Sequence, residues 1–119
     1  MNGQNLDKQP DSSIPFGQII VSPEKTKNYL LDRINGLNRH ISTMREIGEV
    51  SYIENLEPLV ARLKKLADEY KGIEQDKKEL TSLIREIADF IENNLKSESP
   101  KIQESIYNLR KFAQTLETS

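Results

Sequence analysis

The chain has 119 residues, of which 35% are hydrophobic and 30% are charged, and it contains no cysteine and one histidine. This length fits one domain with its own hydrophobic core, and the lack of cysteine excludes disulfides and thiolate metal sites. The 17 basic and 19 acidic residues give a formal net charge of −2, which provides no general attraction to nucleic acid or to an anionic membrane.

Residues 1–22 differ from the rest of the chain in composition and pattern. Met1–Ser13 is polar, shows no hydrophobic periodicity and lacks the apolar core of a signal peptide. The short apolar island Phe16–Val21 follows, and it has two interpretations: it covers an exposed edge of the core, or it docks on a partner. We therefore expect a flexible tail over residues 1–22, which carries the island, and a helical bundle over residues 23–119.

The first long helix is predicted over residues 23–47. Ser22 is a good N-cap and Pro23 suits the first helical position, while Gly48 is a natural residue just past the end. Apolar residues between these signals recur three and four positions apart, which is the spacing of one face of an amphipathic helix. They are Leu30, Ile34, Leu37, Ile41 and Met44.

Two central segments continue this spacing, and they form either two helices or one. A helix is predicted from about Tyr52, because Ser51 begins a capping-box pattern, with a distortion near Pro58. Gly72 costs about 1 kcal/mol in a helix interior, and Asp76 marks a fresh helix start, so we favour a break at Gly72. The two stripes are Leu56, Leu59, Leu63, Leu66 and Tyr70, and then Leu80, Ile84, Ile87 and Ile91.

The last helix is predicted from Pro100 to about Leu116, because Ser99 and Pro100 repeat the Ser-Pro start of the first helix. Its apolar stripe is Ile102, Ile106, Leu109, Ala113 and Leu116. The predicted fold class is therefore all-α, an antiparallel bundle of four helices running up-down-up-down with short loops. The alternative is a bundle of three helices with one long central helix continuous through Gly72.

The pattern offers little for catalysis or for cofactor chemistry. His40, the only histidine, lies about 80° from the centre of the first stripe, so we expect a half-buried or surface position. The sequence has no metal-spaced cluster, no phosphate-binding glycine loop and no carboxylate–histidine pairs for a di-iron site. Its many charges are expected on solvated faces, in pairs such as Arg85–Asp89 and Glu92–Lys96. We expect no catalytic residue, no metal, no cofactor and no small-molecule substrate.

Three regions are candidate partner-binding surfaces: the apolar island, the semi-apolar flank of the first helix, and a group of tyrosine and basic residues on the last helix. Tyrosine and arginine are favoured at interfaces, and a glycine on the flank lets another backbone approach closely. Each helical surface has a second interpretation, as the edge of the protein's own core. The candidate residues are Phe16, Ile19, Ile20, Val21, Tyr29, Gly36, His40, Tyr107, Arg110 and Lys111.

The function predicted from these features is a non-enzymatic protein–protein interaction or assembly module, which acts through its surface and its N-terminal tail. The partner is expected to be another protein or a second copy of the chain. No apolar run approaches the roughly 20 residues needed to cross a bilayer, so no membrane insertion is expected. A cytoplasmic location is expected, with export by a route that needs no signal peptide left open.

The alternative is a nucleic-acid-associated regulatory subunit that uses the mildly basic first helix. Residues 24–47 contain five basic and three acidic residues, a balance of +2. The basic residues spread around the helix instead of forming the single cationic face that a nucleic-acid-binding helix presents. They are Lys25, Lys27, Arg33, Arg39 and Arg45.

Overall fold

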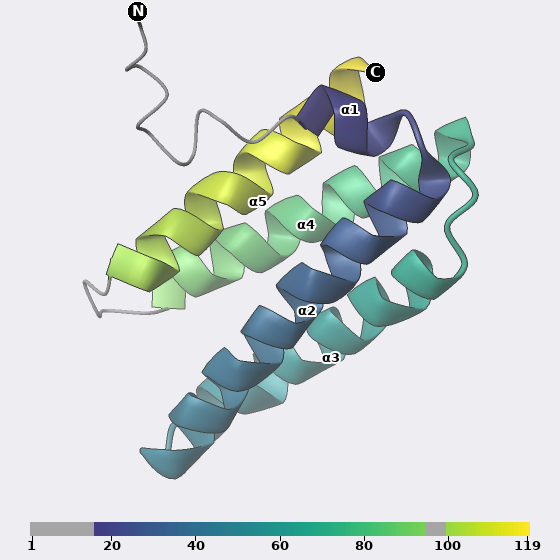
Figure 1. The fold of residues 1–119 in the computed structure, drawn as a ribbon. Helices are drawn as coiled ribbons and strands as arrows, with labels where there is room; N and C mark the ends of the chain where they lie inside the picture. The colour runs from purple at the N-terminus through teal and green to yellow at the C-terminus, as the bar shows by residue number, and fades with distance from the viewer. Residues whose placement is uncertain (1–15, 95–99) are drawn as a thin grey trace, which may run out of the picture.

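The computed structural model describes residues 16–94 and 100–119, and within them every regular element is an α-helix. A short helix precedes four long ones, which run alternately in opposite directions (Figure 1). This confirms the predicted all-α helical bundle. The elements are α1 (Phe16–Ile20), α2 (Pro23–Glu46), α3 (Val50–Asp68), α4 (Glu74–Asn94) and α5 (Pro100–Thr118).

Local signals set the ends of α2 as the sequence indicates. The side chain of Ser22 accepts a hydrogen bond from the backbone N–H of Lys25 at 3.3 Å, and Pro23 is the first helical residue. At the other end, Gly48 has a φ of +83°, a conformation that costs glycine little. Its N–H donates to the carbonyl of Arg45 at 3.1 Å, which satisfies one of the last free acceptors of the helix.

The start of α3 differs from the prediction. The helix begins at Val50, and its N-cap is Glu49, whose side chain makes no capping hydrogen bond. The predicted cap, Ser51, already lies in the first turn, because the tight turn after α2 leads directly into the first helical bond, from the N–H of Ile53 to the carbonyl of Glu49. Pro58 lies inside α3, where its missing N–H removes one backbone hydrogen bond.

The break between α3 and α4 falls at Gly72, which has a φ of +82°. The alternative with one continuous central helix is therefore absent from the structure. However, the predicted cap at Asp76 was wrong, since α4 begins at Glu74. The carboxylate of Asp76 accepts a hydrogen bond from the backbone N–H of Lys71 at 2.7 Å, so it holds the loop that precedes its own helix.

The core lies between the four long helices, and every one of them contributes fully buried side chains. All five residues of the α2 stripe are buried, as predicted. In α3 the buried face is wider than predicted, because this helix packs on both α2 and α4. Leu59 and Leu66 are only half-buried, whereas Tyr52, Ile53, Val60 and Ala67 are buried. Phe112, which lies outside the predicted α5 stripe, is completely buried.

The short helix α1 lies across the end of the bundle where α2 begins and α5 ends (Figure 1). The ring of Phe16 is buried and meets the rings of Tyr29 and Phe112 edge-on, with centroids 5.5 and 5.6 Å away. The hydroxyl of Thr26 donates to the carbonyl of Ile19 at 2.9 Å, which ties α1 to α2. The island therefore covers an edge of the core, while the rest of the predicted tail, residues 1–15, lies outside the described residues.

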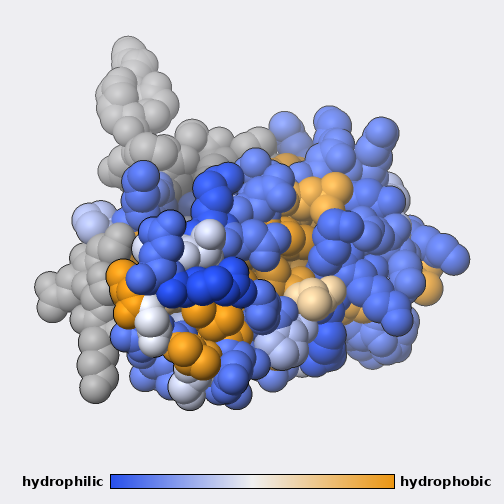
Figure 2. All heavy atoms as spheres, turned by 90° about the horizontal axis from the view of Figure 1, so that it is seen from below, coloured by the Kyte–Doolittle hydropathy of each residue, from blue (hydrophilic) through white to orange (hydrophobic). Residues whose placement is uncertain are grey.

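None of the described helices combines the length and the apolar character that a membrane span requires. The face of the molecule seen in Figure 2 is mostly hydrophilic, with hydrophobic atoms in separate areas between polar side chains. Isolated exposed apolar residues are normal on a protein surface. Among the described residues the large ones are Val21, Ile47, Val50, Ile73 and Tyr107.

Candidate functional site

The first and last long helices, α2 and α5, are joined by no loop, and the seam between them is closed at one end only. At the closed end the rings of Tyr29 and Phe112 lie 4.7 Å apart, beneath Phe16 of α1. Farther along, the two helices diverge (Figure 1) and leave a groove of about 630 Å³. Its walls are Arg33, Gly36, Arg39, His40, Thr43 and Met44 from α2, and Lys101, Ile102, Glu104 and Ser105 from α5.

The floor of this groove is apolar. A smaller recess of about 40 Å³ opens in the same place and reaches the core residues Leu37, Ile91 and Leu109. These three side chains are at most 6% exposed, and half-buried Ile102 lies beside them. The seam between α2 and α5 therefore gives an incoming apolar side chain access to the core of the bundle.

Gly36 forms a notch in the α2 wall of the groove. It lies in the interior of the helix, where glycine costs about 1 kcal/mol relative to alanine. Its φ is not positive, and a Cβ placed there would meet only the guanidinium of Arg39, at 3.8 Å. The fold of this chain therefore gives no reason for glycine at this position.

The rim of the groove carries an excess of positive charge. Arg33, Arg39 and Lys101 line it with a single acidic residue, Glu104, which gives 3 − 1 = +2. Arg33 pairs with Asp32 at 3.1 Å on the outer side of α2, and its guanidinium lies 5.8 Å from the ring centroid of Tyr29. Its Nε is buried and has no hydrogen-bond partner among the described residues.

The hydroxyl of Tyr29 and the Oδ1 of Asn108 are also buried without a partner among the described residues. Arg33 follows Tyr29 by one turn of α2, and Asn108 precedes Phe112 by one turn of α5. Because the helices are antiparallel and Tyr29 contacts Phe112, these polar groups occupy neighbouring levels of the seam, where Arg33 lines the groove and Tyr29 and Asn108 do not. Burial raises the pKa of Tyr29 to about 12, although Arg33 opposes the shift, so the hydroxyl keeps its proton at neutral pH.

His40 connects the groove to the two helices behind it. Its Nε2 shares a hydrogen bond of 2.8 Å with the hydroxyl of Tyr52 on α3, whose ring stacks on Phe90 of α4 at a centroid distance of 5.3 Å. Burial lowers the pKa of His40 and raises the pKa of Tyr52 to about 12. Both groups are therefore uncharged at neutral pH, and they brace α2 against α3 and α4.

The candidate partner-binding residues lie on α2, α5 and α1, and the α1 group touches the α2 group where Phe16 meets Tyr29. Gly36 and His40 line the groove, and Tyr29 lies at its closed end. On α5, Tyr107 and Lys111 are exposed, whereas Arg110 forms ion pairs with Asp89, at 2.8 Å, and with Glu92. In α1, Phe16 is buried, Ile19 and Ile20 are half-buried, and Val21, just beyond it, is exposed.

The groove also contains residues that the sequence interpretation did not assign to it. Ile102 belongs to the apolar stripe of α5, and Arg33 and Arg39 are two of the basic residues that spread around α2, so the sequence pattern does not distinguish them. Ser105 carried no signal at all, because it belongs to the groove only through the position of α5 beside α2. A helical wheel describes one helix, so it identifies a face but not the helix that the face meets.

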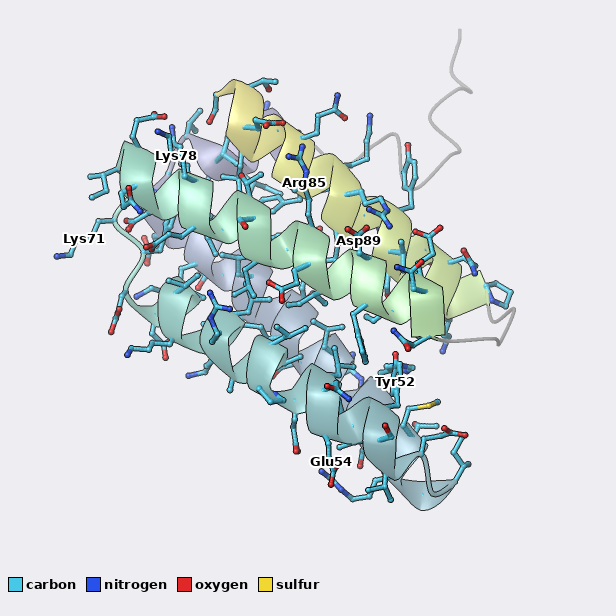
Figure 3. All side chains as sticks on the ribbon, turned by 180° about the vertical axis from the view of Figure 1, so that it is seen from behind. Tyr52, Glu54, Lys71, Lys78, Arg85 and Asp89 are labelled. Carbon is cyan, nitrogen blue, oxygen red and sulfur yellow. The ribbon has the colours of Figure 1, made fainter. Side chains whose placement is uncertain are left out.

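A second groove, of about 640 Å³, follows α4 and α5 on the other side of the molecule, and it differs in chemistry. Its charged residues are of both signs, three basic and four acidic. Arg85 and Asp89 lie on the side of α4 that faces α5 (Figure 3). Arg85 pairs with Glu117 at 2.7 Å, which lowers the pKa of that carboxyl, and Asp89 pairs with Arg110. The predicted Arg85–Asp89 pair along one helix is replaced by pairs between helices.

Among residues 16–94 and 100–119, no group of three or more histidine, aspartate and glutamate side chains is arranged to hold a metal ion. The α2–α5 groove is therefore the candidate site with the clearest chemistry: an apolar floor, a positive rim and a glycine notch. Comparison with protein-family models, with curated proteins and with solved structures finds no match to this chain.

Proposed function

We propose that this protein is a non-enzymatic protein-binding module and that its partner docks in the groove between α2 and α5. The observation that carries this proposal is Gly36. A residue that lowers helix stability without serving the fold is typical of a functional position. Here it opens the wall of the groove just where the apolar floor becomes accessible.

The dimensions of the groove suit a helical segment. From Arg33 to Met44 the α2 wall spans 12 residues, or about 17 Å at 1.5 Å per residue. A partner helix of roughly three turns matches this length, and apolar anchors spaced three and four residues apart would enter the groove together. The His40–Tyr52–Phe90 contacts support the α2 wall from behind, so the surface is formed before the partner arrives.

The nucleic-acid alternative has weaker support. Of the five basic residues on α2, Arg45 pairs with Glu57 at 2.7 Å and Arg33 pairs with Asp32. The five basic residues also spread around α2 and do not form the single cationic face that a nucleic-acid-binding helix presents. Binding that falls steeply with salt concentration would favour this alternative, because many phosphate contacts release many counterions, whereas a helix that docks mainly through its apolar face and makes few charge contacts loses less affinity as salt is added.

Site-specific photo-crosslinking tests the proposal. A photoreactive residue replaces Thr43, which is exposed and lines the groove, or Asn38, which is exposed on the opposite side of α2. Each protein is irradiated in an extract of the cells that produce it. We expect a covalent adduct with a protein from position 43 and none from position 38.

The groove itself is tested by adding Gly36→Trp to the Thr43 probe, because the indole ring would fill the notch. The adduct should disappear in this variant, while circular dichroism shows unchanged helicity. Equal adducts from positions 43 and 38, or an adduct that survives Gly36→Trp, would contradict docking in the groove. An adduct with nucleic acid would support the alternative instead, and an adduct with the chain itself would identify the partner as a second copy.

A further inference from the structure

We infer that the partner segment is an acidic amphipathic helix, with a carboxylate that pairs with Arg33 at the closed end of the groove. This inference rests on the proposed function and adds the chemistry of the partner. Three kinds of observation support it: the positive charge of the rim, the accessible side chain and unused donor of Arg33, and the unpartnered polar groups near Arg33.

The rim attracts a segment of negative charge. Its three cations outnumber its single acidic residue, although the whole protein has a net charge of −2. Arg39 forms no ion pair with any described residue. Oppositely charged surfaces favour encounter and fix the register of a docked segment, so a basic partner helix would be disfavoured here.

The side chain of Arg33 is accessible from the groove, and it also has a buried donor that makes no hydrogen bond with a described residue. It lines both the groove and the deeper recess, and its Nε is buried without a partner among the described residues. A buried donor that makes no hydrogen bond costs free energy. Its present ion pair with Asp32 is exposed, and exposed pairs contribute little, so a carboxylate from the groove competes easily for this guanidinium.

Two further polar groups lie in the α2–α5 seam at the levels next to Arg33. The hydroxyl of Tyr29 is a second donor without a partner among the described residues, and the oxygen of Asn108, which is 94% buried, is an acceptor in the same condition. Both groups are buried and line neither the groove nor the recess, so a bridging water, and not direct contact, would connect them to the partner's carboxylate.

The distance between the two arginines of α2 sets the spacing expected for the acidic residues of the partner helix. Arg33 and Arg39 are six residues apart on α2, or about 9 Å along the helix axis. A partner helix that lies along the groove would match them with carboxylates six or seven residues apart. The apolar anchors then lie between the acids, facing Leu37 and Ile102.

A selection experiment tests this inference. A display library of three- to four-turn amphipathic helices, with a constant apolar face and flanking positions that are acidic, basic or neutral, is selected on the full chain. Each enriched peptide is then synthesised and measured on wild type, Gly36→Trp, Arg33→Gln and Arg62→Gln. Arg62 is an exposed arginine on α3, away from the groove, and provides the matched control.

We expect the enriched peptides to carry aspartate or glutamate six or seven residues apart. Their affinity should fall roughly ten- to hundredfold in Arg33→Gln, be lost in Gly36→Trp and stay unchanged in Arg62→Gln. Peptides that depend on Gly36 but bind Arg33→Gln as tightly as wild type would overturn the inference and leave groove docking intact. Peptides that bind Gly36→Trp unchanged would overturn the proposed function itself.

Discussion

The last helix, α5, forms two seams that differ in how they are held. Along α4, ion pairs connect α5 to its neighbour at two levels, through Arg85 with Glu117 and through Arg110 with Asp89 and Glu92. Along α2, the described residues provide no ion pair, and the helices meet through aromatic rings at one end under α1. The other end is the groove.

This difference follows from chain connectivity. Helices that are consecutive in the chain, such as α4 and α5, are held close by a short connection and pack along much of their length. The first and last long helices have no such connection, so only side-chain packing holds their seam. A bundle can keep this seam partly open without losing its core. The seam is therefore a favourable place for a binding groove.

The largest expected effect on stability is a difference between the closed and the open end of the α2–α5 seam. Phe112→Ala removes a completely buried ring that contacts Phe16 and Tyr29, and it should lower the free energy of unfolding by about 3–5 kcal/mol. Ile102→Ala, at the open end, should cost far less because Ile102 is only half-buried. Denaturant unfolding measures both variants, and similar losses would mean that the two ends do not differ.

A smaller effect, of opposite sign, is expected at Gly36. Gly36→Ala should raise the free energy of unfolding by about 0.5–1 kcal/mol, because the added methyl group meets no crowded neighbour. Gly72→Ala is the control and should destabilise the protein, since its φ is +82° and its Cβ would lie 3.2 Å from Pro23. Destabilisation by Gly36→Ala would show that the fold needs this glycine and would remove the main support for the groove.

The ion pairs of the α4–α5 seam should contribute less than their number suggests. Arg110→Met removes two of them, but all three side chains are well exposed, so the expected loss is at most about 1 kcal/mol. The loss should shrink further as salt is added. Thermal unfolding at low and high ionic strength measures this, and a loss of several kcal/mol would show that charge, not packing, holds this seam.

The smallest effects concern pH and the His40–Tyr52 pair behind the groove. Burial lowers the pKa of His40 below 6.5, so its contribution to stability is present above pH 6.5 and is lost as the pH falls through the folded-state pKa. Burial raises the pKa of Tyr52 from 10.0 to about 12, so its contribution is present below pH 10 and is lost as the pH rises towards 12.

Unfolding measured across this pH range should therefore show a gentle decline on both sides. His40→Gln should flatten the acidic decline below pH 6.5, and Tyr52→Phe should flatten the alkaline decline above pH 10. If the loss of stability at acidic pH is unchanged in His40→Gln, protonation of carboxylates causes that loss. The wall of the groove would then not respond to pH.

Helix starts show where prediction from sequence succeeded and where it did not. Ser22, Pro23 and Gly48 act on their own backbone within a few residues, so their roles could be predicted. Ser51 and Asp76 have equally good capping patterns, but neither caps its helix. The tight turn before α3 moves the helix start ahead of Ser51, and the carboxylate of Asp76 accepts a hydrogen bond from the loop before α4. A capping pattern is therefore dependable only where no neighbouring turn competes for the same groups.

The candidate site was predicted in part. The unusual composition of the α2 flank drew attention to Gly36 and His40 because a glycine and a lone histidine stand out on a helical wheel. Arg33 and Ile102 did not stand out, since an arginine on a surface helix and an isoleucine in a stripe are ordinary. They became part of a site only when α5 was placed beside α2.

The sequence by itself determined that this protein is a helical bundle, because the three- and four-residue spacing of apolar residues is a local property of each helix. It favoured a break at Gly72, through the cost of glycine in a helix, but it left one continuous helix open because the apolar spacing continues through Gly72. Only the tertiary structure decided which seam stays open, because that depends on how α1, α2 and α5 pack. The contacts of Phe112 with Phe16 and Tyr29 join residues 96 and 83 positions apart, and no local pattern specifies them.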